Sequence, residues 1–371
     1  MNPHAQFCHN PDCSAAGQRG LGNIGIHSKK ERRYYCKLCH QPFAATQGTA
    51  FYRLQTEAAV VALVLTLLSL GCPPQAIVAA FGFDERTVAR WQKAAGQQCE
   101  RFHEHWTKGH PVEIQHAQAD ELWIKVVGRR LWMGMAIAVE SRLWLGGVIG
   151  GQRDRSFLRA VVQLIRRAAR HPAMLIGVDG LAGYVRAVQH VFRRPVRTGK
   201  PGRPRLVAEQ GWLLGQVIKQ YAQRRVVAVT QRLVQGSAQE VAVVLKATQG
   251  GGILNTAFIE RLNATFRARL VMLVRRGRAL ARTQAALKAG MYLVGCAYNF
   301  CSFHESLRQP APEGEGRKWI ERTPAMAAGL TPVRWSLFEV LSYPVPPERQ
   351  VVARRRRRPR AVPTRELAMA A

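Results

Sequence analysis

Residues 118–149 read QADELWIKVVGRRLWMGMAIAVESRLWLGGVI, and this stretch predicts three consecutive β-strands. Apolar and β-branched residues dominate the runs 118–127, 131–139 and 143–149, each of which has the length of a strand. The basic turn VGRR (127–130) joins the first two runs. Strands this close in sequence usually pair as hairpins, so the stretch predicts an antiparallel set of neighbours.

The chain continues from these strands as an amphipathic helix at 155–170, a strand at 173–178 and a helix at 181–191. Three hairpin strands, then helix, strand and helix, is the order of an RNase H-like α/β domain with a mixed sheet. In such a sheet the fourth strand pairs beside the first. Asp120 lies early in the first strand and Asp179 ends the fourth. We therefore expect the two carboxylates to meet at the same edge of the sheet.

A third acidic residue lies in NTAFIERLNATFRARL, residues 255–270, which predicts a helix. Glu260, Asn263 and Arg267 occur at i, i+3 and i+7 and therefore share one helix face. Carboxylates held on a sheet and on a neighbouring helix suit a pair of divalent metal ions that cut and join phosphodiesters. Taken singly, Asp179 could instead cap a helix, and Glu260 could be a surface residue.

The composition indicates a polyanionic partner. The 371 residues carry a formal net charge of +32, from 55 Lys plus Arg against 23 Asp plus Glu. Nucleic acid is the most direct partner, because Lys and Arg release condensed counterions when they bind phosphates. A ribosome-associated or membrane-surface protein is the alternative. The apolar run 58–71 is shorter than the roughly 20 residues of a membrane span, so it predicts a buried helix.

The first 50 residues predict a small module that a metal ion holds together. Cys8 and Cys13 form a C-x4-C pair, and Cys36 and Cys39 form a C-x2-C pair. Four thiolates in two close pairs suit tetrahedral structural zinc, and the module resembles a zinc ribbon. Two disulfides are the alternative, which the lack of a visible secretory signal in MNPHAQFCHN disfavours. The remaining cysteines stand on apolar stretches and are expected in cores: Cys72, Cys99, Cys296 and Cys301.

The helix-start and turn signals of residues 51–110 occur in the order typical of a helix-turn-helix domain. Thr56 is expected to cap a helix at 57–70, two prolines to open a second helix, QAIVAAF, and Asp84 to cap a third at 85–95. A plain helical hairpin is the alternative. Polar residues on or near the outward side of the third helix could contact DNA in the major groove: Arg86, Thr87, Arg90 and Lys93.

Residues 193–252 interrupt the pattern, and we expect an insertion between the fourth strand and the helix that carries Glu260. It opens with a basic Pro/Gly-rich loop, RRPVRTGKPGRPR, in which Arg203 and Arg205 could follow a DNA groove. A solvated loop explains these charges equally well. A predicted helix, GWLLGQVIKQYA (211–222), and a strand-like run, RRVVAVTQRLV, follow.

The C-terminal region, 311–371, is rich in Pro and Arg, and we expect it to be partly disordered. It contains the run Arg354–Arg358. A run of like charge without periodicity predicts a tail that binds a polyanion, or simple solvated disorder.

Several motifs together resemble one protein family. The four-cysteine module, the helix-turn-helix pattern, ADELW, VDG and IERLNATFR occur here in that order, followed by YNFCSFHESLR and RTPAMAAGLT. This order resembles the DDE-type transposases of prokaryotic insertion sequences. The resemblance covers about residues 8–335 and implies an RNase H-like catalytic domain at 111–310.

The resemblance implies a role for each residue of the site. Asp120, Asp179 and Glu260 would bind Mg²⁺ or Mn²⁺, as two ions. Arg267, with Asn263, would position a phosphate. Bound metal would also remove the mutual repulsion of three clustered carboxylates.

The spacing of the last two acids departs from the most compact members of this family, because Asp179 and Glu260 are 81 positions apart. Glu209, inside the expected insertion, is therefore a rival for the third acid. Its context, LVAEQGW, lacks the Asn and basic partners found in IERLNATFR.

The implied function is a DNA transposase that binds the ends of an insertion sequence and catalyses metal-dependent strand cleavage and transfer. Its partners would be double-stranded DNA, at element ends and target, and further copies of the chain that join two ends. The resemblance also implies a prokaryotic cytoplasm and association with the nucleoid. The alternatives are a catalytically silent DNA-binding regulator and an RNase H-like nuclease that cuts without joining. The three acids favour catalysis, and the two N-terminal modules favour recognition of ends.

Overall fold

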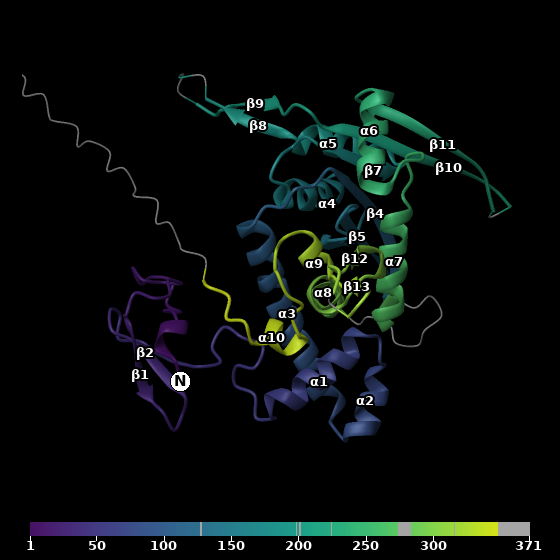
Figure 1. The fold of residues 1–371 in the computed structure, drawn as a ribbon. Coiled ribbons are helices and arrows are strands. Elements are labelled where there is room, and N and C mark those ends of the chain that lie inside the picture. The colour runs from purple at the N-terminus through teal and green to yellow at the C-terminus, as the bar shows by residue number, and fades with distance from the viewer. Residues whose placement is uncertain are drawn as a thin grey trace, which may run out of the picture. The chain divides into compact units, whose positions relative to one another are not determined.

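The computed structural model of the chain describes residues 1–126, 128–197, 199, 202–223, 225–273, 283–314 and 316–347. These residues divide into two compact units. One comprises Met1–Gln47 with Pro346 and Pro347, and the other lies within Gly48–Val345 (Figure 1). The segments predicted as helix-turn-helix and catalytic domains, 51–110 and 111–310, both belong to the second unit.

A small antiparallel sheet builds the first unit. β1 (Ile24–Ser28) pairs with β2 (Arg33–Cys36), and β2 pairs with β3 (Pro42–Ala44). A short 3-10 turn, η1 (Pro3–Ala5), precedes the sheet. Its hydrophobic cluster is small and consists of Cys8, Ile24, Tyr34, Cys36 and Phe43, and Phe7, Ala15 and Ala16 are buried as well. A core this small supplies little hydrophobic stabilisation, so a unit of this size depends on a further link.

A six-stranded mixed sheet forms the centre of the second unit, in the order β11-β10-β7-β4-β5-β6. Its strands are β4 (His116–Val126), β5 (Arg129–Ala138), β6 (Trp144–Gly150), β7 (Leu175–Asp179), β10 (Leu213–Ala222) and β11 (Arg225–Gln235). β4, β5 and β6 are antiparallel neighbours, as their sequence predicted. β7 lies parallel to β4, so the fourth strand pairs beside the first. The predicted α/β class with a mixed sheet is confirmed.

The segment 211–222 is a strand, and the predicted helix is wrong. The first half of β10 is buried and runs parallel to β7. The run LLGQVI fits a buried strand as well as a helix, so the neighbouring strands decide the conformation. β11 pairs antiparallel with β10, and the two strands project from the body as a long ribbon (Figure 1). Residues 193–252 are therefore more than an insertion, because they supply a strand of the central sheet.

Three further elements of this segment differ from the prediction. β8 (Arg193–Val196) and β9 (Arg205–Ala208) form an antiparallel hairpin where a loop was expected. α6 (Ala238–Gln249) was not predicted, although a capping box between Ser237 and Glu240 opens it. Apolar side chains of α6, including Val241 and Leu245, pack on β7 and β10.

Helices cover both faces of the sheet: α4 (Arg155–Ala168) and α5 (Ala182–Val191) lie on one, and α7 (Ala257–Arg269) and α8 (Gln284–Cys296) on the other (Figure 1). Glycines in the strands permit close contact. A Cβ atom at Gly134 would lie 2.4 Å from Val161 of α4. One at Gly147 would lie 2.4 Å from Met291 of α8. Any larger residue at either position would push a helix away from the sheet.

The predicted helices of residues 51–110 are present as α1 (Ala58–Ser69), α2 (Pro74–Phe81) and α3 (Glu85–Gly109). The carboxylate of Asp84 caps α3 by accepting hydrogen bonds from two backbone N–H groups, as predicted. Thr56 does not cap α1, which begins after Glu57 without a side-chain cap. α3 is far longer than predicted, because buried residues continue along it to Phe102 and pack against α8. This packing joins the helical segment to the sheet in one unit.

The structure describes residues 311–314 and 316–347 of the C-terminal region. The rest of this region, which was expected to be partly disordered, lies outside the described residues. The remaining short elements of the second unit are η2 (Val271–Leu273), η3 (Ala297–Cys301), η4 (Glu305–Leu307), β12 (Gln309–Pro310), β13 (Trp319–Ile320), α9 (Pro324–Ala327) and α10 (Leu337–Ser342). α10 packs against α1 with Val340 and Leu341 fully buried. The run Arg354–Arg358 lies outside the described residues. No helix in the described part of the chain has both the length and the apolar character needed to cross a membrane.

Candidate metal centres

The four cysteines of the first unit converge. The Sγ atoms of Cys8 and Cys39 are 3.5 Å apart, those of Cys13 and Cys36 are 3.9 Å apart, and all four lie within 4.8 Å of one another. Tetrahedral bonds of ~2.3 Å to one metal separate sulfurs by about 3.8 Å, whereas a disulfide needs about 2.05 Å. All four cysteines are free thiols, so the alternative of two disulfides is not observed. The cluster could hold a metal ion.

Backbone amides favour the metal-binding form of one of these cysteines. Burial raises the pKa of Cys36, but the N–H groups of Cys39 and Leu38, together with the thiols of Cys8 and Cys39, lower this pKa to about 7. The side chain of Asn23 also donates to the Cys36 sulfur, at 3.5 Å. The lowered pKa favours the thiolate of Cys36, and the thiolate is the form that binds metal.

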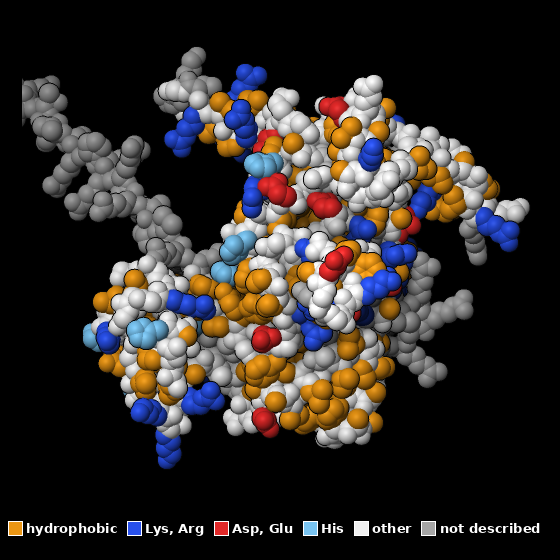
Figure 2. Space-filling model, viewed as in Figure 1, with side chains coloured by type: hydrophobic (Ala, Val, Ile, Leu, Met, Phe, Trp, Pro, Cys, Tyr) orange, Lys and Arg blue, Asp and Glu red, His pale blue; other side chains and the backbone are white. Residues whose placement is uncertain are grey.

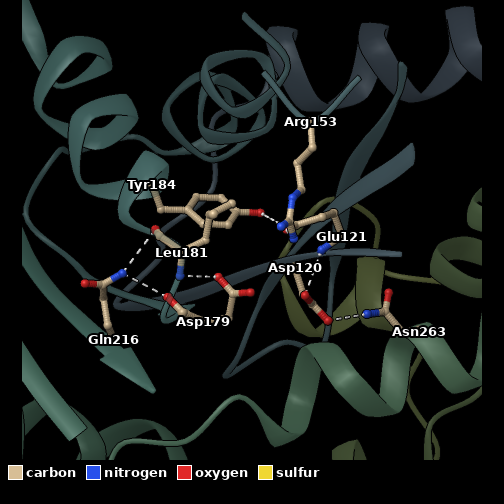
Figure 3. A network of polar contacts seen from close by, with 8 residues as sticks. All are labelled: Asp120, Glu121, Arg153, Asp179, Leu181, Tyr184, Gln216 and Asn263. Atoms are coloured by element: carbon tan, nitrogen blue, oxygen red, sulfur yellow. Dashed lines mark hydrogen bonds and ion pairs between the residues drawn. The ribbon is translucent and has the colours of Figure 1, made fainter. Parts of the chain in front are cut away.

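The second cluster lies in the central sheet. Asp120 of β4 and Asp179 at the end of β7 are neighbours on parallel strands, since the preceding residues Ala119 and Val178 are paired in register. Carboxylate oxygens of Asp120, Glu121 and Asp179 lie within 4.8 Å of one another. Figure 3 shows the two aspartates and Glu121 in one polar network. This group too could hold a metal ion.

Asp120 is held on both of its oxygens and is strongly perturbed. Oδ1 accepts from the backbone N–H of Glu121 at 2.8 Å, and Oδ2 accepts from Asn263 at 2.7 Å (Figure 3). Burial, followed by the charges of Glu121, Asp179 and Glu260, raises the pKa of Asp120 to about 7. A nearby cation would reverse this effect, because it favours the ionised carboxylates.

Glu121 is a site residue that the sequence analysis missed. Its side chain is almost fully buried, where Arg153 donates to Oε1 at 2.7 Å and the hydroxyl of Tyr184 donates to Oε2 at 2.6 Å. Burial raises the pKa of Glu121, and these two partners oppose the rise. Both carboxylate oxygens of Glu121 accept hydrogen bonds from these side chains, so Glu121 acts as a support of the acidic cluster. Its position directly after Asp120 in ADELW was the available signal.

Glu260 of α7 faces the same region from the other side. The side chain of Gln118 in β4 bonds the backbone of Asn255 and Ile259, and this anchors the start of α7 to the sheet. Lys219 of β10 pairs with the Glu260 carboxylate, and Thr256 donates to it at 2.6 Å. Burial raises the pKa of Glu260, but Lys219 and Thr256 outweigh burial and lower it. Lys219 was missed because its strand was predicted as a helix.

One cavity connects these acids. Its volume is about 610 Å³, and its walls include Asp120, Asp179 and Glu260 together with the basic residues Arg153, Lys219 and Arg267. Asn263 does not line the cavity, but it holds Asp120, and its own Oδ1 is buried without a hydrogen-bond partner. Carboxylates and space for water form an all-oxygen donor set, which suits Mg²⁺ or Mn²⁺.

Glu209, the rival third acid, lies elsewhere. Both of its oxygens accept from Arg166 of α4, at 2.7 Å and 2.5 Å, and its side chain is mostly buried. It does not line the acidic cavity. Its role is a bidentate ion pair that ties the β9–β10 connection to α4.

The candidate DNA-binding residues lie on two separate surfaces. Arg86, Arg90 and Lys93 are exposed on α3, where they border a cavity shared with the start of α8, and Thr87 bonds Arg90 beside them. Trp91 is buried. Arg203 and Arg205 are exposed on the β8–β9 hairpin. Figure 2 shows Lys and Arg side chains on this hairpin and at the far end of the β10–β11 ribbon.

The comparisons with known proteins add no relative. No protein-family model matches the chain, and a search of curated proteins finds no match to its sequence.

Proposed function

We propose that this chain is a DDE-type transposase that binds DNA ends and catalyses metal-dependent strand cleavage and transfer. One observation carries the proposal. Asp120, Asp179 and Glu260 come from two strands and a helix far apart in sequence, yet they line a single cavity. The surrounding chain has a net charge of +32, so acids gathered in one cavity require a reason. A cation site beside a bound polyanion supplies that reason.

The topology supports an RNase H-like catalytic domain. The order β6-β5-β4-β7-β10, with β7 parallel to β4, is the arrangement expected for that fold. α4 precedes β7 and α5 follows it, which also fits. β11, the β8–β9 hairpin and α6 are then additions to the common sheet.

The residues present fit a divalent metal pair. Asp120, Asp179 and Glu260 would hold the ions, with Asn263 fixing the orientation of Asp120. The chemistry that bound Mg²⁺ supplies is activation of an attacking water or 3′-hydroxyl and stabilisation of the leaving oxygen. Lys219 neutralises Glu260 in the form described here and would exchange for metal on loading.

The basic residues of the acidic cavity would bind the phosphate of the DNA backbone. Arg153 and Arg267 line the cavity and can bind the non-bridging oxygens of a phosphodiester. Glu121 fixes Arg153 by an ion pair, and the Trp132 ring lies 4.8 Å beneath its guanidinium. A guanidinium held in this way loses little freedom when it binds a phosphate.

DNA recognition would belong to the N-terminal half of the chain. We assign structural zinc to Cys8, Cys13, Cys36 and Cys39, in a zinc ribbon. The exposed basic residues at the start of α3 would contact DNA in the major groove. The expected setting is prokaryotic cytoplasm, where element and target DNA are both accessible.

A catalytically silent DNA-binding regulator is the second candidate. The ion pair between Lys219 and Glu260 favours it, because this pair occupies one of the three acids. The two candidates differ in a single property, which is DNA cleavage in the presence of Mg²⁺.

The test uses the full-length protein and supercoiled plasmid that carries the DNA flanking its gene. We expect Mg²⁺-dependent cleavage that Asp120→Asn, Asp179→Asn and Glu260→Gln each reduce by at least roughly a hundredfold, since even supporting residues of metal sites cost 10–100-fold. Binding of the same DNA should persist in all three variants. Glu209→Gln is the matched control and should still cut. Cleavage at the wild-type rate by Glu260→Gln would remove Glu260 from the site, and no cleavage by the wild type would favour the regulator.

A further inference from the structure

A second cavity, of about 440 Å³, lies against α7 and shares no lining residue with the acidic cavity. We call it the arginine pocket. Polar and aromatic side chains define it: Arg142, Arg261, Arg269, Tyr298, Ser302 and His304. α7 forms a wall of both cavities. Glu260 faces the acidic cavity, whereas Arg261, the next residue, lines the arginine pocket.

The described residues neutralise the positive charge of the arginine pocket only in part, because the charge of Glu140 acts on Arg142. None of their carboxylates forms an ion pair with Arg142, Arg261 or Arg269. Two acids lie nearby. Glu305 is largely exposed and pairs with Arg308, and Glu140 accepts a hydrogen bond from a backbone amide. Three guanidiniums around one cavity repel each other unless an anion is bound between them.

Arg142 occupies an unusual backbone conformation. It lies in the turn between β5 and β6 with φ of 57°, in the left-handed region that favours glycine. The hydroxyl of Tyr298 donates to the Arg142 carbonyl at 3.0 Å, and the guanidinium lies 4.1 Å from the centre of the Phe258 ring. The backbone alone would favour glycine here. The Arg142 side chain lines the pocket, and its guanidinium also donates a hydrogen bond to the Val139 carbonyl.

The other two guanidiniums approach from α7. Arg261, Thr265 and Arg269 occur at i, i+4 and i+8, and all three line the pocket as one stripe of the helix. Arg269 donates to the hydroxyl of Ser302 at 3.1 Å. The Arg261 side chain is exposed. Hydroxyl groups, guanidiniums and aromatic rings together form a lining that can bind both phosphate oxygens and the flat face of a base.

We propose that the arginine pocket binds a phosphate-bearing nucleotide. Guanidinium groups match phosphate oxygens bidentately, and the volume is sufficient for a nucleotide and not only for a phosphate ion. That the nucleotide belongs to a DNA strand engaged at the acidic cavity rests on the function proposed above. The affinity for a nucleotide phosphate does not depend on that function.

The first experiment measures binding of thymidine 3′,5′-bisphosphate to the full-length protein by calorimetry, in buffer without added Mg²⁺ or Mn²⁺. Under these conditions no added metal can bridge phosphate to the acidic cavity. Neither Arg142 nor Arg261 lines that cavity, so a loss of binding in their variants reports on the arginine pocket. We expect Arg142→Gly and Arg261→Gln each to weaken binding by about tenfold, as for loss of one charged hydrogen bond. Arg167→Gln, which removes an exposed arginine of α4, is the matched control and should bind as the wild type does.

The choice of variants also guards against a folding artefact. Glycine accepts the left-handed conformation, which offsets part of the loss of the contacts with Phe258 and Val139. Arg261→Gln, at an exposed side chain, should melt as the wild type does. No binding by the wild type, or equal binding by Arg142→Gly, Arg261→Gln and wild type, would overturn the proposal. An equal loss in Arg167→Gln would also overturn it, because the effect would then be one of general charge.

A second experiment separates free nucleotide from DNA. The same variants are titrated with a 20-base-pair duplex over a salt series. If the pocket holds a strand phosphate, Arg142→Gly and Arg261→Gln should each lower the salt slope by about one unit relative to Arg167→Gln. Nucleotide binding with an unchanged DNA slope would limit the pocket to free nucleotides. The wild type could bind the nucleotide and yet fail to cut DNA in the presence of Mg²⁺. That result would support the proposed nucleotide pocket and contradict the transposase proposal.

Discussion

Asp120 is the residue on which the acidic cavity depends most. It is bonded to α7 through Asn263 and to its own strand through the Glu121 amide, so it links the sheet to the helix that carries Glu260. Its pKa of about 7 records the burial and repulsion that this position imposes. Without a cation, the native state holds Asp120 in an environment that opposes ionisation, which has a measurable consequence for stability.

We predict that this site makes the stability of the protein without Mg²⁺ fall as pH rises. The pKa of Asp120 is about 7 in the folded chain and 3.8 as an ordinary value. A raised pKa stabilises the folded state fully below the unfolded value and loses that contribution as pH rises to the folded value. We compare the free energy of unfolding of the wild type with that of Asp120→Asn. The difference, wild type minus variant, should fall by about 1.4 kcal/mol per pH unit between pH 4 and 7.

Urea denaturation at several pH values measures this difference. Added Mg²⁺ should remove the slope, because bound metal favours the ionised carboxylate in the folded state. A difference that stays constant from pH 4 to 7 without Mg²⁺ would show that Asp120 is not perturbed as described.

Glu121 should matter more for stability than Glu260, although Glu260 is the better candidate for a metal ligand. Removing Glu121 leaves the buried Tyr184 hydroxyl without its acceptor and Arg153 without its ion pair. We expect Glu121→Ala to lower the free energy of unfolding by about 2–3 kcal/mol. Glu260→Ala, at a side chain 46% exposed, should cost below about 1 kcal/mol. Denaturation without Mg²⁺ compares them, and the opposite order would refute the supporting role of Glu121.

At the scale of elements, the sequence predicts those whose local pattern and tertiary setting agree. The three antiparallel strands follow one another closely, and α3 begins at a cap that Asp84 supplies as predicted. β10 fails this rule. It pairs with β7, a strand 34 or more positions earlier, and no local signal reports that pairing. The same long-range contact brings Lys219 to Glu260, so the error in the element removed a residue from the predicted site.

The acidic site was predictable only where chemistry and spacing coincide in the sequence. Asp120 and Asp179 follow from the register of parallel strands, and Glu260 follows from its helix face. Tyr184 and Arg153 could not be predicted, because their contacts with Glu121 arise from the packing of α5 and the α4 connection over the sheet. The predicted Thr56 cap is wrong, because α1 begins after Glu57 without a side-chain cap hydrogen bond.

The exposed start of α3 carries a prediction about specificity. Arg86 and Arg90 are exposed one turn apart, and base-edge contacts discriminate by ~1–3 kcal/mol each. Arg86→Ala or Arg90→Ala should therefore reduce the preference for end DNA over random DNA by roughly tenfold. Deleting residues 353–371 should instead weaken both DNAs alike and flatten the salt slope, because phosphate contacts carry no sequence information.

Binding of both DNAs across a salt series distinguishes these effects. The assignment of α3 fails if the tail deletion destroys the preference for end DNA while both arginine substitutions preserve it. It also fails if Arg86→Ala and Arg90→Ala lower affinity for random DNA as much as for end DNA.

At the scale of the whole molecule, the two units are stabilised by different means. The second unit buries a continuous apolar core that runs from α1 through the sheet to α10. The first unit buries only a few side chains around its cysteines. Burial therefore stabilises the second unit by itself, whereas we expect the first unit to depend on a metal ion held by its four cysteines.

We predict one tightly bound zinc per chain and an unfolded first unit when that zinc is lost. Zinc–thiolate binding in small modules supplies about 10–16 kcal/mol of apparent folding free energy, far more than so small a core can provide. In Cys36→Ser, hydrogen exchange should become fast throughout residues 1–47, and elemental analysis should find less than stoichiometric zinc. Protection of the strands β4 to β7 should be unchanged, because their core is separate. Cys72→Ser, at a half-buried cysteine outside the cluster, is the control and should retain zinc and protection. Wild-type protein that lacks zinc yet protects residues 1–47 would contradict the metal link.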